Sequence, residues 1–137
     1  MKVLVIYCTS FSYLLSTKTL ELVDQSSQGE SYNDCIVAFI QVEQEDEEKE
    51  IAGREKKLAN HLKWTARKNN TTQIVLHSFA HLSESKASIE YTKTLFDLAQ
   101  IRLHNGGYTT NQTPFGYFLD LSINAPGFSL ARLWATL

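Results

Sequence analysis

The chain has 137 residues, a formal net charge of −2 and 43% hydrophobic residues. These values are typical of one globular domain, residues 1–137, with an ordinary hydrophobic core. The negative charge argues against a protein that coats nucleic acid nonspecifically, which needs a basic surface, but it does not exclude a protein that binds only the last nucleotide or two of an RNA.

The first half of the chain contains two apolar runs, a polar stretch between them and an acidic stretch after them. Val3–Tyr7 and Cys35–Val42 are short and continuous, which predicts two buried strands. The polar residues 16–34 predict a long loop or a poorly paired hairpin. Residues 43–50 are mostly acidic and predict the start of a helix, because carboxylates are stabilised at the positive end of the helix dipole. We expect this helix to run to about Lys68.

The second half of the chain alternates strands with one further helix. The predicted elements are a strand over Gln73–His77, a break at 78–83, a helix over Lys86–His104 stopped by Gly106 and Gly107, strands over Tyr108–Asn111 and Phe115–Ile123, and a terminal helix or strand over Leu130–Leu137. The inner face of the second helix is expected to consist of Ile89, Phe96, Ala99 and Leu103. The order β-β-α-β-α-β-β predicts a single-domain α/β layered sandwich with a mixed β-sheet and two main helices.

The two cysteines, Cys8 and Cys35, do not form a CxxC pair, which argues against a disulfide framework or a cysteine-based zinc site. We interpret both as buried thiols in a reducing compartment. The apolar N-terminal run is too short for a signal peptide, and no apolar run approaches the roughly 20 residues that cross a bilayer. We therefore expect a cytoplasmic protein that does not insert into a membrane.

The sequence contains no motif of a common cofactor or metal site. There is no glycine-rich phosphate-binding loop, no HExxH zinc motif and no GxSxG nucleophile motif. The four histidines do not have the spacing of zinc ligands, and His77 and His81 flank a junction between strand and loop instead of sharing a helix face. We expect neither a metal nor a cofactor.

Two short segments carry the functional signal. Phe79–Ser83 follows the third predicted strand, and Thr113–Tyr117 opens the last long one. Taken alone, the second segment has a purely structural interpretation, in which Pro114 begins a strand, Gly116 relieves crowding and the aromatic side chains pack.

Together with other parts of the chain, these segments resemble the N-terminal editing domain of archaeal threonyl-tRNA synthetases from end to end. The matching residues are Val3–Tyr7, Val37–Glu43, Phe79–Ser83, Pro114–Tyr117 and Leu130–Ala131. The resemblance implies a fold like that of the D-aminoacyl-tRNA deacylases, usually in a homodimer, and a proofreading hydrolase that removes L-serine from threonine tRNA. Such proofreading has a physical rationale, because a binding pocket distinguishes side chains that differ by one methyl group by only about 1–3 kcal/mol.

The resemblance also implies a site for the aminoacyl-adenosine at the 3′ end of the tRNA. Main-chain atoms of Ser78, Phe79 and Ala80 would contact the amino acid and the adenine, and amides of this loop would stabilise the oxyanion of ester hydrolysis. His81 would be a catalytic contact to the substrate or would orient another group; the alternative is a buried histidine with a structural role. The other pocket residues would be Val42, Phe115, Gly116, Tyr117, Phe118, Leu119 and Arg132. Few protein side chains need to take part in the reaction itself, because a ribose hydroxyl of the RNA would assist hydrolysis.

Three positions depart from the family pattern. Leu119 stands where the family has a lysine associated with activating water, Phe118 where it has tyrosine and Arg132 where it has glutamate. Asp120 cannot replace the lysine, because strand alternation points it to the opposite face. Arg132 could restore one positive charge near the site, but a guanidinium cannot act as a base at neutral pH.

Three functions therefore remain open. The first, which we favour, is an editing hydrolase, either freestanding or part of a threonyl-tRNA synthetase. The second is a homologue that binds the tRNA 3′ end or aminoacyl-adenosine without hydrolysing it. The third is a deacylase for another mischarged pair, for example one that carries a D-amino acid.

Overall fold

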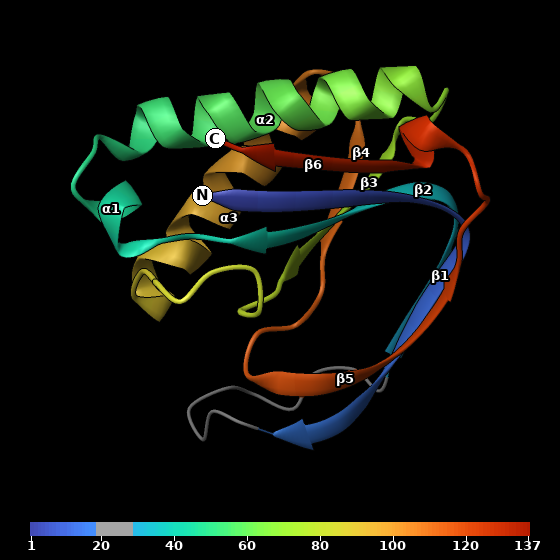
Figure 1. Ribbon diagram of the computed structural model, residues 1–137, viewed down its shortest axis with the longest axis horizontal. Coiled ribbons are helices and arrows are strands. Elements are labelled where there is room, and N and C mark those ends of the chain that lie inside the picture. The colour runs from blue at the N-terminus through green and yellow to red at the C-terminus, as the bar shows by residue number, and fades with distance from the viewer. Residues whose placement is uncertain (19–28) are drawn as a thin grey trace.

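The computed structural model describes residues 1–18 and 29–137. Its elements are β1 (Lys2–Lys18), β2 (Gly29–Gln41), α1 (Gln44–Glu47), α2 (Ile51–Lys68), β3 (Gln73–Ser78), α3 (Ile89–Asn105), β4 (Thr109–Gln112), β5 (Tyr117–Asn124), a 3₁₀ turn η1 (Ser129–Ala131) and β6 (Arg132–Thr136). The six strands form one sheet, and both long helices pack on the same face of it (Figure 1). The expected single-domain α/β sandwich, with a mixed sheet and two main helices, is confirmed.

β1 is the strand around which the sheet is organised. The strand order is β4-β3-β2-β1-β5, and β6 pairs with the first half of β1 while β5 pairs with the second half. β2, β3 and β4 run parallel to one another, whereas β1 is antiparallel to each of its neighbours. The carboxyl ends of three parallel strands therefore lie together at one end of the sheet, where open α/β sheets commonly bind ligands.

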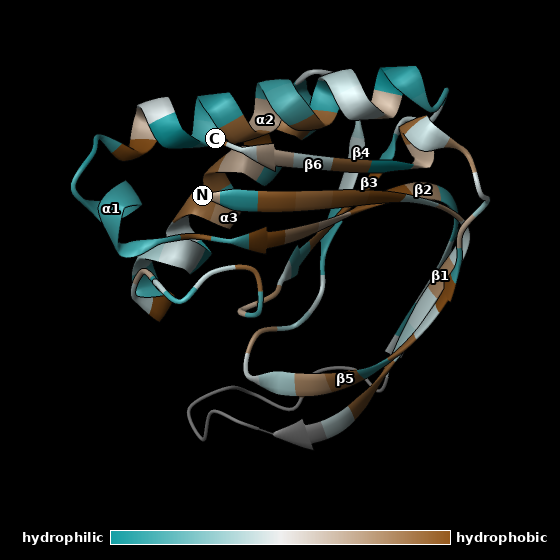
Figure 2. Cartoon of the chain, in the orientation of Figure 1, coloured by the Kyte–Doolittle hydropathy of each residue, from teal (hydrophilic) through white to brown (hydrophobic). Residues whose placement is uncertain are grey.

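The sheet has a hydrophobic cluster on each face. On the first face, strand residues such as Val5 and Ile40 pack against Leu62 of α2 and Phe96 of α3. The second cluster consists of Cys8, Phe11, Tyr13, Cys35, Val37, Phe39 and Val75. Figure 1 shows that the second half of β1 bends away from the helices together with β5. Figure 2 shows apolar residues concentrated in the central strands, while most of the visible surface of α2 is hydrophilic.

The first two strands are longer than the apolar runs predicted. β1 continues to Lys18 and β2 begins at Gly29, so the prediction of a loop or a poorly paired hairpin over 16–34 is wrong at both described ends; residues 19–28 lie outside the described part. In this region polar residues alternate with aromatic ones, and Phe11 stacks on Tyr32 with ring centroids 6.5 Å apart. One side of this hairpin is exposed, so it needs no continuous apolar run.

The helices begin later than predicted. The acidic stretch forms the separate one-turn helix α1, and α2 begins only at Ile51, after a break at residues 48–50. α3 begins at Ile89 instead of Lys86, because Ser88 caps it: the Tyr91 N–H donates to Ser88 Oγ at 3.2 Å. Ile89 is 49% exposed, so its predicted place on the inner face is wrong, whereas the other three predicted residues of that face are buried. The terminal element is the strand β6.

The two cysteines are neighbours across the β1–β2 hairpin. Cys8 and Cys35 are directly paired in the register, and both are fully buried free thiols, as predicted. Burial raises the pKa of Cys8 to about 11 and that of Cys35 to about 12. Both thiols are therefore protonated at neutral pH and are poor nucleophiles.

Candidate functional site

Two adjoining pockets lie where the carboxyl ends of β2 and β3 meet the loops that lead into α3 and β5. The residues that line both are Ser78, Phe79, Ala80, Lys86, Ile89 and Phe115. The narrow pocket has a volume of about 120 Å³. The wide pocket has a volume of about 430 Å³, which lies within the range of about 300–1,000 Å³ typical of ligand sites.

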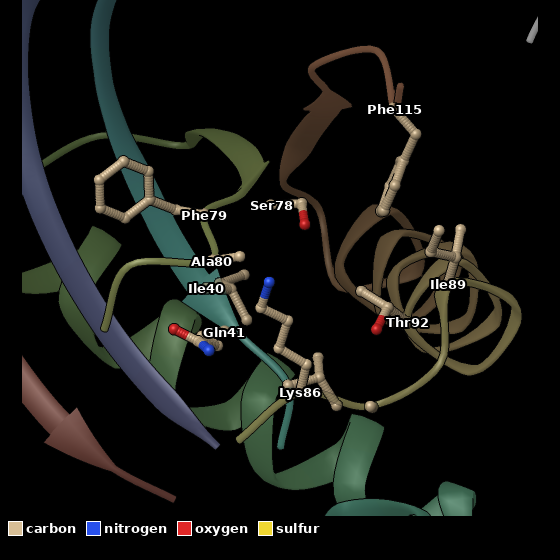
Figure 3. A pocket seen from close by; sticks show the side chains of 11 residues that line it. Ile40, Gln41, Ser78, Phe79, Ala80, Lys86, Ile89, Thr92 and Phe115 are labelled. Atoms are coloured by element: carbon tan, nitrogen blue, oxygen red, sulfur yellow. The ribbon is translucent and has the colours of Figure 1, made fainter. Parts of the chain in front are cut away.

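The narrow pocket has mainly apolar walls. Its remaining lining residues are Ile40, Gln41, Val42, Ala87 and Thr92. Figure 3 shows Phe115 and Ile89 on one side of the space and Ile40 and Ala80 on the other. The side chain of Lys86 extends between them, with its ammonium group directed toward Ser78.

The wide pocket brings together the two segments that the sequence singled out. Its remaining lining residues are His77, His81, Thr113, Pro114, Gly116, Tyr117, Phe118, Leu119 and Leu121. Residues 78–81 form one wall and residues 113–119 form the other. Every predicted site residue except Arg132 thus lines one of the two pockets.

Gln41 fixes the loop between β3 and α3. Its side chain is buried, and its Nε2 donates to the carbonyl oxygens of Ser83 at 2.7 Å and Ser85 at 2.9 Å. Its Oε1 accepts from the N–H groups of Leu82 at 2.6 Å and Ser83 at 2.7 Å. One side chain therefore satisfies four backbone groups of a loop that has no regular structure.

Two backbone bonds fasten the ends of the same loop to β2 and the residue after it. The Phe79 N–H donates to Ile40 O at 3.0 Å, and the Ala87 N–H donates to Val42 O at 2.9 Å. The position of the pocket wall is therefore set by the last residues of β2.

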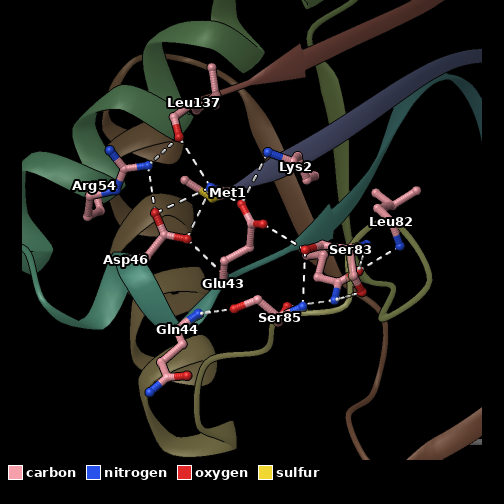
Figure 4. Close-up of polar contacts among 11 residues, drawn as sticks. Met1, Lys2, Glu43, Gln44, Asp46, Arg54, Leu82, Ser83, Ser85 and Leu137 are labelled. Atoms are coloured by element: carbon pink, nitrogen blue, oxygen red, sulfur yellow. Dashed lines mark hydrogen bonds and ion pairs between the residues drawn. The ribbon is translucent and has the colours of Figure 1, made fainter.

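A buried ion-pair cluster lies beside the loop and is bonded to it (Figure 4). The N-terminal ammonium of Met1 lies 2.8 Å from Glu43 Oε1 and 3.1 Å from Asp46 Oδ2, and Arg54 Nη2 lies 2.7 Å from Asp46 Oδ1. Ser83 Oγ donates to Glu43 Oε2 at 2.7 Å. Burial alone would raise the pKa of Glu43, but hydrogen bonds from the ammonium and from Ser83 lower it to about 2. Glu43 is therefore ionised at neutral pH and ties the loop to this cluster.

Two backbone amides of the loop are available to a ligand. The N–H groups of Ala80 and His81 have no hydrogen-bond partner in the part of the chain that the structure describes, whereas those of Phe79, Leu82 and Ser83 are all satisfied. Both residues line the wide pocket. Adjacent unpaired N–H groups at a pocket wall are suited to an oxyanion.

The two histidines near the site differ sharply in environment. His81 is exposed and packs edge-on against Phe79, with ring centroids 5.1 Å apart, so it is not the buried structural histidine of the alternative interpretation. That description fits His77, which is buried and packs edge-on against Phe39. Its Nδ1 is hydrogen-bonded to Thr113 Oγ1 at 2.8 Å. Burial lowers the pKa of His77 to about 4, so its ring is neutral at pH 7.

Position 119 faces the wide pocket. Leu119 and Leu121 both line it, and Phe118, which also lines it, is 62% exposed. Asp120 instead lines a separate pocket beside Ser12 and Glu30. As strand alternation predicts, Asp120 lies on the opposite face of β5 from Leu119.

Arg132 is not brought to the site. It begins β6, opposite Ile6, and its Nη1 donates to Pro126 O at 2.8 Å. Arg132 therefore does not supply a positive charge near Leu119, contrary to the expectation from the sequence. The reason is that β6 pairs with the first half of β1, whereas the pocket wall is on β5, which pairs with the second half.

Sequence reasoning missed three residues that shape the site: Gln41, His77 and Lys86. Gln41 carried a signal, since it is a polar residue in an otherwise apolar predicted strand. His77 was noticed only as a potential metal ligand. Lys86 carried no signal, because one lysine in a polar stretch is ordinary. Among the described residues, no group of three or more His, Cys, Asp or Glu side chains is arranged to hold a metal, and no helix is long and apolar enough to cross a membrane.

Comparisons with known proteins agree with this architecture. Residues 1–137 match the sequence model of a family described as the archaea-specific editing domain of threonyl-tRNA synthetase. Relatives include the threonine–tRNA ligases of Thermococcus sibiricus, 26% identical over 142 residues, and Methanobrevibacter smithii, 29% identical over 140 residues. Both alignments cover 100% of this chain, but they cover 22% and 23% of the ligases, so the chain spans about a fifth of their length.

A solved structure shares the fold. The c-Myc DNA Unwinding Element Binding Protein matches with a TM-score of 0.60 and 13% sequence identity, over 100% of this chain and 99% of that chain. At this identity the match shows the fold alone, and it agrees with the D-aminoacyl-tRNA deacylase-like fold that the family resemblance implied.

Proposed function

Because this chain belongs to the archaea-specific editing-domain family of threonyl-tRNA synthetase, we propose that it proofreads threonine tRNA by hydrolysing the ester of wrongly attached L-serine. The observation that carries this proposal is the pocket between residues 78–81 and 113–119, whose wall includes the N–H groups of Ala80 and His81, neither of which has a partner among the described residues. The partner is the 3′ end of the tRNA, which presents the aminoacyl-adenosine.

The reaction that we propose needs few protein side chains. The oxygen of a water molecule bonds to the ester carbon, and the carbonyl electron pair moves to the carbonyl oxygen, where the Ala80 and His81 amides would stabilise it. The tetrahedral species then collapses: the bond from carbon to the ribose oxygen breaks, and that oxygen takes a proton that came from the attacking water. The products are free serine and a tRNA with an intact 3′ end. A ribose hydroxyl of the RNA would help to orient the water, and exposed His81 would contact the substrate.

The narrow pocket is the proposed place for the amino acid. Its small volume and apolar walls suit a short side chain, and Val42, Ala80 and Phe115 approach it from three different segments. Rejection of threonine requires that the added methyl group meets a wall that does not yield. The four hydrogen bonds of Gln41 would keep that wall in place.

The test is deacylation of threonine tRNA charged separately with L-serine and L-threonine. Loss of serine alone above the spontaneous rate is the expected result, and equal stability of both esters would overturn the proposal. D-amino acid esters run beside them decide whether the chain is instead a deacylase for another mischarged pair.

A second candidate function is binding of the 3′ end without hydrolysis. Leu119 favours it, because this apolar side chain lines the wide pocket where the family carries lysine. Binding of a non-hydrolysable seryl-adenosine analogue without any turnover of seryl-tRNA would establish this alternative.

We also propose that the chain acts as a homodimer, freestanding or as part of a threonyl-tRNA synthetase. Large apolar side chains are exposed along the edge formed by β5, η1 and β6. They are Phe118, Ile123, Phe128, Leu130 and Trp134. Exposed apolar edges commonly mark an interaction surface. Light scattering on the purified chain gives the mass; a monomer at all concentrations would contradict the dimer.

A further inference from the structure

We propose that Lys86 is a catalytic residue of this site, where its ammonium stabilises the negative charge that develops on the ester carbonyl oxygen. This inference rests on the proposed hydrolase function. In this proposal the positive charge of the site comes from the loop before α3, because Leu119 and the other β5 residues that line the wide pocket carry no positive charge.

The first observation is position. Lys86 lines both pockets, and its ammonium group extends into the narrow one in the direction of Ser78 (Figure 3). Ser78 begins the wall that carries the N–H groups of Ala80 and His81, which have no partner within residues 1–18 and 29–137. Ala80, His81 and Lys86 all line the wide pocket, so a carbonyl oxygen that accepts hydrogen bonds from those amides would lie in a cavity that Lys86 also lines.

The second observation is charge. Lys86 is the only lysine, arginine, aspartate or glutamate among the described residues that line either pocket. Its ammonium has no ion pair and no hydrogen bond with any residue of ranges 1–18 and 29–137. Lys86 is exposed, so this uncompensated cation is free to interact with a ligand.

The third observation is that the base of the side chain is fixed while its tip is not. The neighbouring Ala87 N–H is bonded to Val42 O, and Ser85 on the other side is bonded to Gln41 and Gln44. The backbone at position 86 is thus held between two anchored residues. The flexible stem of Lys86 can follow the charge from the planar ester to the tetrahedral species.

The negative charge balances as follows. Attack of water moves one electron pair onto the carbonyl oxygen, the Lys86 ammonium and the two amides stabilise it, and the pair returns to form the carbonyl of serine when the bond to the ribose oxygen breaks. Lys86 keeps its proton throughout, so no further reactant is required.

The experiment compares the unaltered chain with K86M, K86R and the matched control K93M, under single-turnover conditions with L-seryl-tRNA. Lys93 is an exposed lysine on α3 that lines neither pocket. Removing one oxyanion-stabilising group typically slows catalysis by about 10²–10³-fold, so K86M is expected to lose about 100-fold in rate. K86R is expected to retain most of the rate, because it keeps the charge, and K93M should match the unaltered chain.

Binding of a non-hydrolysable seryl-adenosine analogue separates a role in catalysis from a role in binding. An affinity of K86M within about threefold of the unaltered chain, alongside the slow rate, supports charge stabilisation in the transition state. An equal loss of rate and affinity would overturn it, as would a K86R rate as slow as that of K86M. An active unaltered chain with an equally active K86M would overturn this role alone, whereas an inactive unaltered chain would overturn the proposed function itself.

Discussion

The side chain of Gln41 allows a sharp test of how the pocket wall is held. Replacing it with leucine keeps its size and suits its buried position, but removes all four hydrogen bonds to the loop. Two N–H groups and two carbonyl oxygens of Leu82, Ser83 and Ser85 then lose their partner. An unsatisfied buried polar group costs about 1–3 kcal/mol, but these residues are half-buried and water can replace part of the loss. We expect Q41L to lose roughly 3 kcal/mol of stability, which lowers the melting temperature by on the order of 10 °C.

The activity of Q41L should fall further than its stability suggests. The amides of Ala80 and His81 are adjacent to the clamped residues, and a displacement of about 1 Å at a catalytic group can cost on the order of 100-fold in rate. We therefore expect seryl-tRNA deacylation to drop by about that factor at a temperature where Q41L is still folded. Gln73→Leu is the matched control, because Gln73 lies on the neighbouring strand β3 and its side chain makes no hydrogen bond with another described residue.

Hydrogen exchange provides a readout that does not depend on turnover. The N–H groups of Leu82 and Ser83 should be protected in the unaltered chain and exchange rapidly in Q41L, while β1 and β2 keep their protection. A Q41L protein with an unchanged melting temperature, unchanged exchange at these two amides and full activity would refute the idea that one glutamine holds the loop.

Three further predictions concern the buried side chains of His77 and Asp46 and the pocket position 119. Burial lowers the pKa of His77 to about 4 from about 6.5 in the unfolded chain. The stability that neutral His77 contributes is therefore complete above pH 6.5, and the free energy of unfolding falls by roughly 3 kcal/mol between pH 6.5 and pH 4. In denaturant melts across this range, H77Q should remove that part of the pH dependence, and H104Q, at an exposed histidine, should not. D46N removes a buried carboxylate from the Met1 ammonium and from Arg54, so it should lower the free energy of unfolding by about 3–5 kcal/mol in denaturant melts. The control Glu45→Gln, at an exposed position, should lower it by less than about 0.5 kcal/mol. Equal effects of the two substitutions would contradict a stabilising role of the ion-pair cluster. L119K should raise the deacylation rate of K86M by at least about tenfold but change the rate of the unaltered chain little. Additive effects of the two substitutions in this double-mutant cycle would show that positions 86 and 119 do not act on the same substrate charge.

The fold was largely predictable because continuous apolar runs marked its central strands. Cys35–Val42 is buried on both faces of the sheet, and Val3–Tyr7 is largely buried on one face and half-buried on the other, so the signal of each strand is a local run of apolar residues. The outer half of the first hairpin was missed because Phe11 and Tyr13 alternate with polar residues on a strand that is exposed on one side. The start of α3 was placed three residues early because its position depends on the cap by Ser88.

The candidate site was predictable only where a resemblance supplied it. The segments at 78–81 and 113–119 line one pocket, but nothing in their spacing alone indicates that β3 and β5 present them to each other. The roles of Gln41 and His77 depend on contacts with residues about 36 to 44 positions away in sequence. Arg132 was expected at the pocket because it follows a family motif in the sequence. The pairing of β6 with the first half of β1 places it elsewhere.

Discrimination against a single methyl group connects these features. A pocket that yields by a few tenths of an ångström would admit threonine, because the energy at stake is only about 1–3 kcal/mol. Loops are ordinarily the most mobile parts of a fold, yet here a loop forms the wall. In this chain the loop is bonded to Gln41, to the carboxyl end of β2 and, through Glu43, to a buried ion-pair cluster. The only uncompensated charge in the described walls is then placed on the flexible side chain of Lys86. The rigid wall would thus provide selectivity, and the flexible Lys86 side chain would stabilise the charge that develops during the reaction. Variants of Gln41 and Lys86 should separate these two roles. Q41L should weaken the preference for serine over threonine, whereas K86M should slow hydrolysis without changing that preference.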